Sequence, residues 1–397
     1  MSITERPARI LVFSPYEPPS DGIAMHTARL VGVWDSAGHT VMVIAPGKQS
    51  RIEDAEPVGV RSKVARILRQ VPRRQTWKEL VAFEPDVIFV QFAIAALNVN
   101  IWTVRSLCRK FKTAGIPVVV AYHEPAREFD LLGPATRFVY RAMARVTSVP
   151  VVYSWAGRQT LVERGLFKEV VEVPLGTAGL ATISDEDLRR VRIRYHVAKP
   201  AVLVLGFTHF DKGTDLLLDA AADIAERRHH DVQFIIAGSP RKRRGVFRIM
   251  GRRDIRCQRR LESQAKKIVG VGIEFFGFVK SEDVAALLYV ADIVALPYRR
   301  ITQSGVASLA LSSRAVMVAS DLPGLRSDLG DAATYVEVGD SRAMAEQIAQ
   351  LLDESSDSLR AHMRSLAGER AVSNTLEVVA EAILLAALNA RGARSGY

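Results

Sequence analysis

Short runs of apolar, β-branched residues alternate along this chain with stretches whose apolar residues recur at helical spacing. In the first half, such runs predict strands at residues 8–13, 40–45, 86–91, 117–121 and 170–173. The stretch that joins the first two runs places its apolar side chains on one face of a helix. Continuous apolar strands separated by helices are typical of a parallel sheet that is covered on both faces. The first half is therefore predicted to be a doubly wound α/β domain.

The same pattern starts again near residue 200. A charged helical stretch at 184–195 precedes Lys199-Pro200, and further strands are predicted at residues 201–206, 232–237, 273–276, 292–296 and 315–319. The sequence thus predicts an α/β protein with two successive Rossmann-like domains, at 1–190 and 198–372. Ligands of such folds bind beyond the carboxyl ends of the strands, so we expect the site in a cleft between the domains. The remaining segment, 373–397, is predicted to form an apolar helix that crosses back to the first domain.

Composition narrows the class of protein. The 397 residues include only two cysteines, Cys108 and Cys257, without the spacing of a disulfide framework or a zinc site. The first residues do not read as a signal peptide, and no apolar run approaches the roughly 20 residues of a membrane-spanning helix. We therefore expect a cytoplasmic protein, and its formal net charge of +11 suggests an anionic partner.

Two loops that follow first strands could bind phosphate. The loop at 14–22 ends with Gly22 at the start of a helix, where free amides can meet an anion. The loop at 206–213 carries Lys212, which could point its charge toward a phosphate. Alternatively, the first is an ordinary strand–helix turn and the second carries a solvated lysine.

A third segment, 296–306, ends a strand and opens an apolar helix. Ser304 can cap that helix while the amides of Gly305 and Val306 face an anion, and Arg299 and Arg300 would raise the local positive potential. A plain helix cap is the alternative interpretation.

In order and spacing, these segments resemble the retaining family 4 glycosyltransferases of the GT-B fold, over about residues 10–352. The resemblance is carried by Pro18 to Ala24, Phe207 to Ala220, Phe276-Gly277, Ala291 to Tyr298, Thr302 to Val306 and Ser320 to Leu325. It implies two Rossmann-like domains, a nucleotide-sugar donor bound mainly by the second and a carbohydrate or lipid-linked acceptor bound mainly by the first.

The resemblance also implies roles for individual residues. His123 and Lys212 would be catalytic, Gly22, Lys212, Ser304, Gly305 and Val306 would bind the donor phosphates, Gly277, Phe278 and Tyr298 would lie near the base and ribose, and Thr302 and Gln303 would lie near the donor sugar. Cationic and amide groups aimed at the leaving diphosphate would stabilise its growing charge. No cofactor or metal is expected, because the sequence has no convincing Asp-x-Asp motif and the departing phosphate can help to take the acceptor proton.

The chain departs from the family pattern at several positions. The two glutamates of the Glu-x7-Glu motif are replaced by Thr302 and Ala310, the arginine that often precedes the family's lysine is Phe207, and a further common glutamate is Ser327. These changes leave the donor undetermined and keep a non-catalytic role open.

Basic residues cluster in three places. Twelve lysines or arginines lie between Arg241 and Lys267, and a second cluster between residues 61 and 78 includes Arg66, Arg69, Arg73 and Arg74. In the second cluster Val64, Leu68 and Val71 have helical spacing, which predicts a basic amphipathic helix at an anionic membrane interface. A third cluster lies between Arg105 and Lys112. Solvated faces are the alternative, and nucleic acid is disfavoured because no recognition motif is present.

The sequence therefore predicts a retaining, metal-independent hexosyltransferase that acts on a lipid-linked or surface-glycan acceptor at the cytoplasmic membrane face, of unknown oligomeric state. Transfer to a soluble small molecule, a non-catalytic partner subunit and a nucleic-acid-binding protein are the alternatives.

Overall fold

The computed structural model describes residues 7–16, 22–46, 56–57, 61–67, 73–97, 100–177, 179–197, 200–227, 231–240, 248–301 and 304–392. The chain divides into two compact units. The first contains residues 1–176 and 376–397, and the second contains residues 177–375. The predicted first domain, 1–190, thus extends past the end of the first unit, because helix α8 (Asp185–Arg194) packs on the second unit's helix α11 (Ser281–Val290).

The first unit is built on a sheet with the strand order β3-β4-β2-β1-β5-β6-β7-β8. All of its neighbours are parallel except the β3–β4 pair. The strands are β1 (Arg9–Phe13), β2 (Thr40–Pro46), β3 (Glu56–Pro57), β4 (Lys63–Ile67), β5 (Val87–Phe92), β6 (Val118–Tyr122), β7 (Val149–Val152) and β8 (Val171–Glu172). The helices are α1 (Gly22–Ser36), α2 (Arg73–Ala82), α3 (Ile94–Leu97), α4 (Ile101–Thr113), α5 (Pro125–Leu132), α6 (Pro134–Ala144), α7 (Trp155–Glu163) and α16 (Leu376–Gly392).

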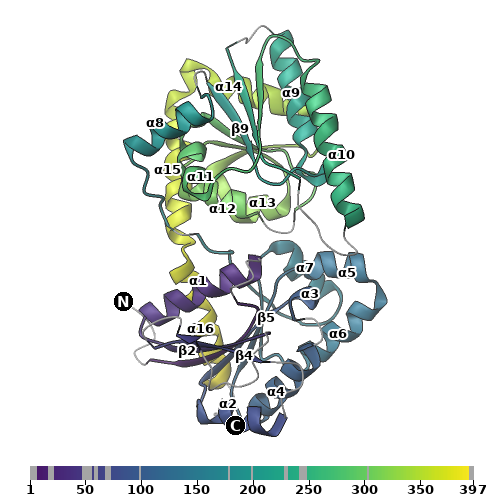
Figure 1. The fold of residues 1–397 in the computed structure, drawn as a ribbon, viewed down its shortest axis with the longest axis vertical. Helices are drawn as coiled ribbons and strands as arrows, with labels where there is room; N and C mark the ends of the chain where they lie inside the picture. The colour runs from purple at the N-terminus through teal and green to yellow at the C-terminus, as the bar shows by residue number, and fades with distance from the viewer. Residues whose placement is uncertain are drawn as a thin grey trace. The chain divides into compact units, whose positions relative to one another are not determined.

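Alternate residues of β1 enter two separate cores, one on each face of this sheet. Ile10 and Val12 pack with residues of α1 and α16, whereas Leu11 and Phe13 pack with residues of α4 and α6. The C-terminal helix lies beside α1, as the yellow and purple ribbons show in Figure 1, and the indole nitrogen of Trp34 donates to the carbonyl of Ala380. Residues from the two ends of the chain therefore complete one core.

The predicted basic amphipathic helix through Val64, Leu68 and Val71 is wrong at Val64, and Leu68 and Val71 lie outside the described residues. Residues 63–67 form strand β4, which pairs in parallel with β2 in the register Met42↔Lys63 to Pro46↔Ile67. Main-chain hydrogen bonds to the edge of the sheet outweigh the helical spacing of the apolar residues here. Arg66 lies in β4, Arg73 and Arg74 begin α2, and Arg69 lies outside the described residues.

The second unit is built on a parallel sheet with the strand order β11-β10-β9-β12-β13-β14. Its strands are β9 (Ala201–Leu205), β10 (Gln233–Ala237), β11 (Gly272–Phe276), β12 (Ile293–Leu296), β13 (Met317–Ser320) and β14 (Ala333–Val336). Besides α8 and α11, its helices are α9 (Thr214–Glu226), α10 (Arg248–Ala265), α12 (Gly305–Ser312), α13 (Pro323–Leu329), α14 (Ser341–Leu352) and α15 (Asp357–Ser373), with 3-10 turns η3 (Phe210–Lys212), η5 (Gly330–Ala332) and η6 (Glu354–Ser356). Alternate residues of β9 lie in separate cores on opposite faces of the sheet.

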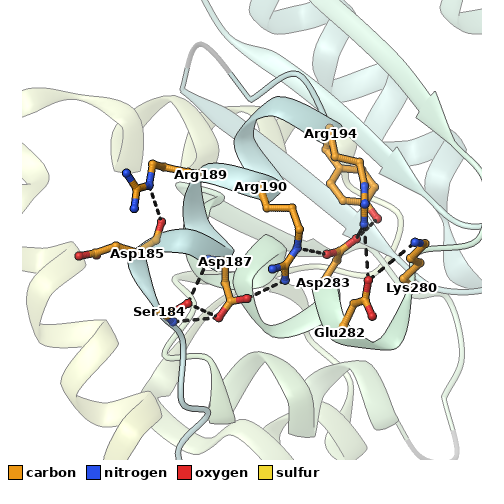
Figure 2. Close-up of polar contacts among 10 residues, drawn as sticks. Ser184, Asp185, Asp187, Arg189, Arg190, Arg194, Lys280, Glu282 and Asp283 are labelled. Atoms are coloured by element: carbon orange, nitrogen blue, oxygen red, sulfur yellow. Dashed lines mark hydrogen bonds and ion pairs between the residues drawn. The ribbon is translucent and has the colours of Figure 1, made fainter.

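A buried carboxylate attaches α8 to the second unit. Figure 2 shows Arg190 and Arg194 of α8 directed at Asp283, the fully buried acid of α11. Arg190 Nε lies 3.1 Å and Arg194 Nη1 lies 2.5 Å from its two oxygens, and the Tyr195 hydroxyl donates to it at 3.1 Å. Burial opposes ionisation of Asp283, but the hydrogen bonds from Arg194, Arg190 and Tyr195 outweigh it and lower the pKa of this carboxyl. The network replaces the water that Asp283 loses on folding.

Replacing Asp283 with alanine is expected to lower the free energy of unfolding by about 2–3 kcal/mol, because Tyr195 and two partly exposed arginines lose a charged hydrogen-bond partner. The neighbouring Glu282, whose side chain is well exposed, provides a matched control: Glu282→Ala should change stability by less than about 1 kcal/mol. Urea unfolding followed by circular dichroism measures both. Equal effects of the two substitutions would contradict this account of the network.

Candidate active site

Lys212 lies on a tightly constrained loop between β9 and α9. The loop starts at Gly206, with φ at 118°, and its last residue before the helix is Gly213, with φ at 61°. A Cβ atom on Gly213 would lie 1.8 Å from the carbonyl oxygen of Pro297. Only glycine permits this left-handed turn and this close approach. The loop that carries Lys212 is therefore held against the end of β12.

The ammonium group of Lys212 lies over an aromatic ring. Its Nζ atom is 3.6 Å from the centroid of the Tyr298 ring, which is a close cation–π contact. Tyr298 is buried, and its hydroxyl lies 3.3 Å from the Oγ atom of Ser304. One side chain thus connects the lysine to the cap of α12.

Helix α12 begins beside the same loop. The Ser304 hydroxyl accepts a hydrogen bond from the amide of Ala307 at 3.1 Å and caps the helix. The amides of Gly305 and Val306 are first-turn donors that the helix itself does not use. Val306 Cγ2 lies 3.3 Å from the place where a Cβ on Gly206 would stand. The structure therefore brings together four residues predicted to bind phosphate, Lys212, Ser304, Gly305 and Val306, in a region whose dipole and ammonium group favour an anion.

The expected contribution of Arg299 to this positive region is wrong. Its guanidinium forms two hydrogen bonds of 2.7 Å to the Asp215 carboxylate and lies 4.3 Å from the Phe210 ring centroid. Its amide also donates to the Asp211 carbonyl. Arg299 therefore fixes the Lys212 loop, and Asp215 offsets its charge. Arg300 is well exposed, with its Nε atom 3.8 Å from an Asp211 oxygen.

The predicted base and ribose residues occupy different environments. Gly277 and Phe278 follow β11, next to the end of β10, and Phe278 is 76% exposed. The Tyr298 side chain, by contrast, is buried behind Lys212, so its ring supports the lysine and does not offer a free surface to a ribose. Thr302 and Gln303 lie outside the described residues. Ala310 is buried in the core of the second unit, where the family's glutamate would need a polar partner.

The first unit contains a cluster of two histidines around one amide. Gln91 at the end of β5 is fully buried, and His123, directly after β6, and His26 on α1 are nearly so. His123 Nε2 lies 2.5 Å from Gln91 Oε1, and Gln91 Nε2 lies 3.3 Å from His26 Nδ1. The second ring nitrogen of His26, Nε2, is 3.0 Å from the carbonyl oxygen of Leu175. The Tyr153 hydroxyl donates to Gln91 Oε1 at 3.4 Å.

This geometry fixes a neutral tautomer for both rings. Since a carbonyl oxygen can only accept, His26 carries its proton on Nε2 and accepts from Gln91 at Nδ1, and His123 carries its proton on Nε2. Burial, with a smaller effect of His26, lowers the pKa of His123 to about 3. Burial also lowers the pKa of His26 to about 4, partly opposed by the bond to Leu175. His123 therefore holds Nδ1 as a hydrogen-bond acceptor at neutral pH.

Stability should decrease as the pH falls from about 6.5, because both histidines stay neutral when folded but bind protons when unfolded. Between about pH 6.5 and its own pKa in the folded protein, each histidine is expected to lower the free energy of unfolding by about 1.4 kcal/mol per pH unit. Thermal unfolding between pH 7.5 and 5 measures the slope. The dependence of stability on pH should be weaker in His26→Gln. It should be unchanged in His362→Gln, which alters an exposed histidine of α15. Identical slopes for the two variants would contradict the assignment.

Gly22 is the first residue of α1 and belongs to the same unit as His123. Among the described residues, no atom outside its chain neighbours and its own helix backbone lies within 4 Å of the place where its Cβ would stand. Behind it, Ser14 at the end of β1 hydrogen-bonds Thr27 of α1 at 2.7 Å. That Gly22 and His123 face the Lys212 region of the second unit across a cleft stays a prediction.

Sequence reasoning missed Gln91, His26 and the supporting role of Tyr298. For Gln91 a signal was present, since it is the one polar side chain in the otherwise apolar strand Val87–Phe92. His26 carried none, because its contact with Gln91 joins residues 65 positions apart.

The described residues contain neither a candidate metal centre nor a helix that could span a membrane. No group of three or more histidine, cysteine, aspartate or glutamate side chains in them is arranged to hold a metal ion. None of the helices within that part of the chain combines the length and the apolarity needed to cross a bilayer.

Solved structures of other proteins match the arrangement of strands and helices in both units. Over 99% of the chain, the structure matches the UDP-forming α,α-trehalose-phosphate synthase of Burkholderia vietnamiensis at 13% identity, with a TM-score of 0.70 and 100% of that chain covered. The sucrose-phosphate synthase of Thermosynechococcus elongatus gives 0.68 at 16% identity, covering 98% and 100% of the two chains. The HepE protein of Anabaena, solved with UDP, gives 0.69 at 17%, covering 96% and 99%. The protein has the two-domain GT-B fold.

Sequence comparison identifies the family. The model described as Glycosyltransferase Family 4 matches residues 20–177, and the model described as Glycosyl transferases group 1 matches residues 199–354. The α-D-kanosaminyltransferase of Streptomyces kanamyceticus is 27% identical over 177 residues, 43% of this chain. That match spans 42% of the relative's length. The chain belongs to the family 4 glycosyltransferases.

Proposed function

We propose that this protein transfers a sugar, with retention of configuration, from a nucleoside-diphosphate sugar to a lipid-linked or surface-glycan acceptor at the cytoplasmic membrane face. The observation that carries the proposal is the arrangement of Lys212 on Tyr298, 3.6 Å from its ring, beside the capped start of α12. A lysine and helix amides held in advance are suited to stabilising the charge that develops on a leaving diphosphate.

In this proposal the donor lies on the second unit. Lys212 and the amides of Gly305 and Val306 bind its phosphates, and the backbone at Gly277 and Phe278 borders the base. The departing phosphate accepts the acceptor's proton as the new glycosidic bond forms on the same face of the sugar. Paired carboxylates of the glycosidase type are then not required. We propose that no metal ion takes part, so EDTA should leave the rate unchanged.

In the first unit we assign His123 as the residue that contacts the reacting sugar. Its Nδ1 atom is an acceptor because Nε2 donates to Gln91. A neutral imidazole held in one tautomer can accept a hydrogen bond from a sugar hydroxyl without placing a positive charge beside the oxocarbenium-like transition state.

A direct test supplies the purified chain with radiolabelled UDP-, GDP- and ADP-sugars together with a bacterial lipid extract or a soluble sugar acceptor. We expect label in the lipid or glycan fraction with one of the donors. If only soluble acceptors are labelled, the proposed lipid-linked or surface-glycan acceptor is wrong and the acceptor is a soluble molecule. Neither transfer nor donor hydrolysis would overturn the proposed activity and favour a non-catalytic role.

A further inference from the structure

Helices α4 and α6 of the first unit lie side by side and run in the same direction. Near their N-terminal ends, the rings of Trp102 and Phe138 are 5.7 Å apart. Farther along, Arg105 Nε donates to the Ala142 carbonyl at 3.0 Å, and Lys112 Nζ donates to the Arg145 carbonyl at 3.1 Å. These contacts join the two helices along their length, and both helices are labelled in Figure 1.

Large aromatic side chains on this surface are exposed to solvent. Trp102 is 44% and Phe138 is 66% exposed, and Leu132 at the end of neighbouring α5 is also exposed. The rings contact each other, yet much of their apolar area remains in water. Grouped exposure of this kind marks a binding surface more often than single exposed residues do.

Positive charge accompanies the aromatic pair. Trp102, Arg105 and Arg109 recur at spacings of three and four residues on α4, and Phe138, Arg141 and Arg145 recur in the same way along and just beyond α6. Neither helix sequence contains an acidic residue. We define the α4–α6 face by its exposed members, which are Trp102, Arg109, Arg137, Phe138, Arg141 and Arg145.

We propose that the α4–α6 face binds the surface of a bilayer rich in anionic lipid. The aromatic pair enters the headgroup region, where rings of tryptophan and phenylalanine are favoured, and the arginines contact lipid phosphates. The rings lie toward the N-terminal ends of the helices and most of the arginines toward the C-terminal ends. This separation suits an interfacial anchor, whereas a platform for nucleic-acid bases would interleave rings and cations along a groove.

The inference extends the proposed function, which places the acceptor in a membrane, but it concerns a different surface. Nucleotide binding by the second unit does not involve these helices. The two proposals can therefore fail separately, and each has its own measurement.

The test is sedimentation of the full chain with vesicles of phosphatidylglycerol and phosphatidylcholine or of phosphatidylcholine alone. The wild type should bind only the anionic vesicles, and less as salt is raised. Trp102→Ala with Phe138→Ala, and separately Arg109, Arg141 and Arg145→Gln, should each lower the partition coefficient about tenfold. Arg192→Ala with Ile193→Ala, a matched exposed cation and apolar pair on α8, is the control and should bind as the wild type does.

The location of the anchor is checked by quenching with brominated lipid, which should be strong in the wild type and largely lost in Trp102→Phe. Undiminished vesicle binding by both face variants would overturn the proposal. Two other results would also overturn it: the wild type associates with itself, or it binds RNA, and in either case Trp102→Ala with Phe138→Ala abolishes that association but leaves vesicle binding intact. Thermal stabilisation by a nucleoside diphosphate, measured on the same variants, reports separately on the donor site and should be unchanged.

Discussion

Replacing Lys212 with alanine is expected to lower the rate of sugar transfer by about two to three orders of magnitude while leaving the fold intact. The lysine is held 3.6 Å above the Tyr298 ring on a loop fixed by Gly213, so its charge is in place before the diphosphate begins to leave. Loss of one such preorganised group commonly costs a factor of about 100 to 1,000. Steady-state transfer with the donor found to be active, together with far-ultraviolet circular dichroism, measures both parts of the prediction.

Lys266→Ala is the matched control, because that exposed lysine follows α10 on the same unit and precedes the N-terminal end of β11, whereas the proposed site follows the carboxyl ends of the strands. It should transfer sugar at the wild-type rate. Tyr298→Leu keeps Lys212 but removes the ring beneath it, and should produce an intermediate loss. Transfer by Lys212→Ala at the same rate as by Lys266→Ala would remove Lys212 from the mechanism.

Replacing Gln91 with glutamate is expected to shift the acid limb of the pH profile of kcat/KM toward neutral pH and to reduce activity at pH 7. In the wild type, the amide oxygen of Gln91 accepts a hydrogen bond from His123, and its NH2 group donates one to His26. A carboxylate would lie between the two rings, favour their protonated forms and raise the pKa of His123 from about 3. A protonated ring would still donate at Nε2, but its Nδ1 could no longer accept.

Gln159→Glu, a change of the same chemical kind on the surface of α7, should leave the profile unchanged. Gln91→Glu should also regain activity as the pH is raised, which a merely unfolded variant would not do. An unaltered pH profile in a folded Gln91→Glu protein would show that the amide does not set the state of His123.

Regular apolar patterns made much of the fold predictable. The strands predicted at 8–13 and 201–206 correspond to β1 and β9, because central parallel strands are buried on both faces and leave an uninterrupted apolar run. Residues 63–67 gave no such run, and the spacing of Val64, Leu68 and Val71 among basic residues favoured a helix. Their pairing with β2 depends on a partner strand that no local pattern contains.

The candidate site was predictable to a different extent in its two parts. Lys212 and the Ser304 to Val306 turn follow strands whose order and spacing match a family pattern, so their approach could be expected. The burial of Tyr298 and the pairing of Arg299 with Asp215 depend on side-chain packing across the ends of β9 and β12. For the same reason Arg299, expected from sequence to raise the local positive potential, forms an ion pair with Asp215 instead.

The central claim is that Lys212 and the start of α12 bind the diphosphate of a nucleotide sugar. Isothermal titration calorimetry of the full chain with UDP, GDP and ADP, each in the wild type, Lys212→Ala and Lys266→Ala, tests it most directly. We predict that at least one nucleotide binds the wild type and Lys266→Ala equally and binds Lys212→Ala at least about tenfold more weakly, a loss of about 1.4 kcal/mol. Equal affinity in all three proteins, or no binding of any nucleotide to the wild type, would contradict the account.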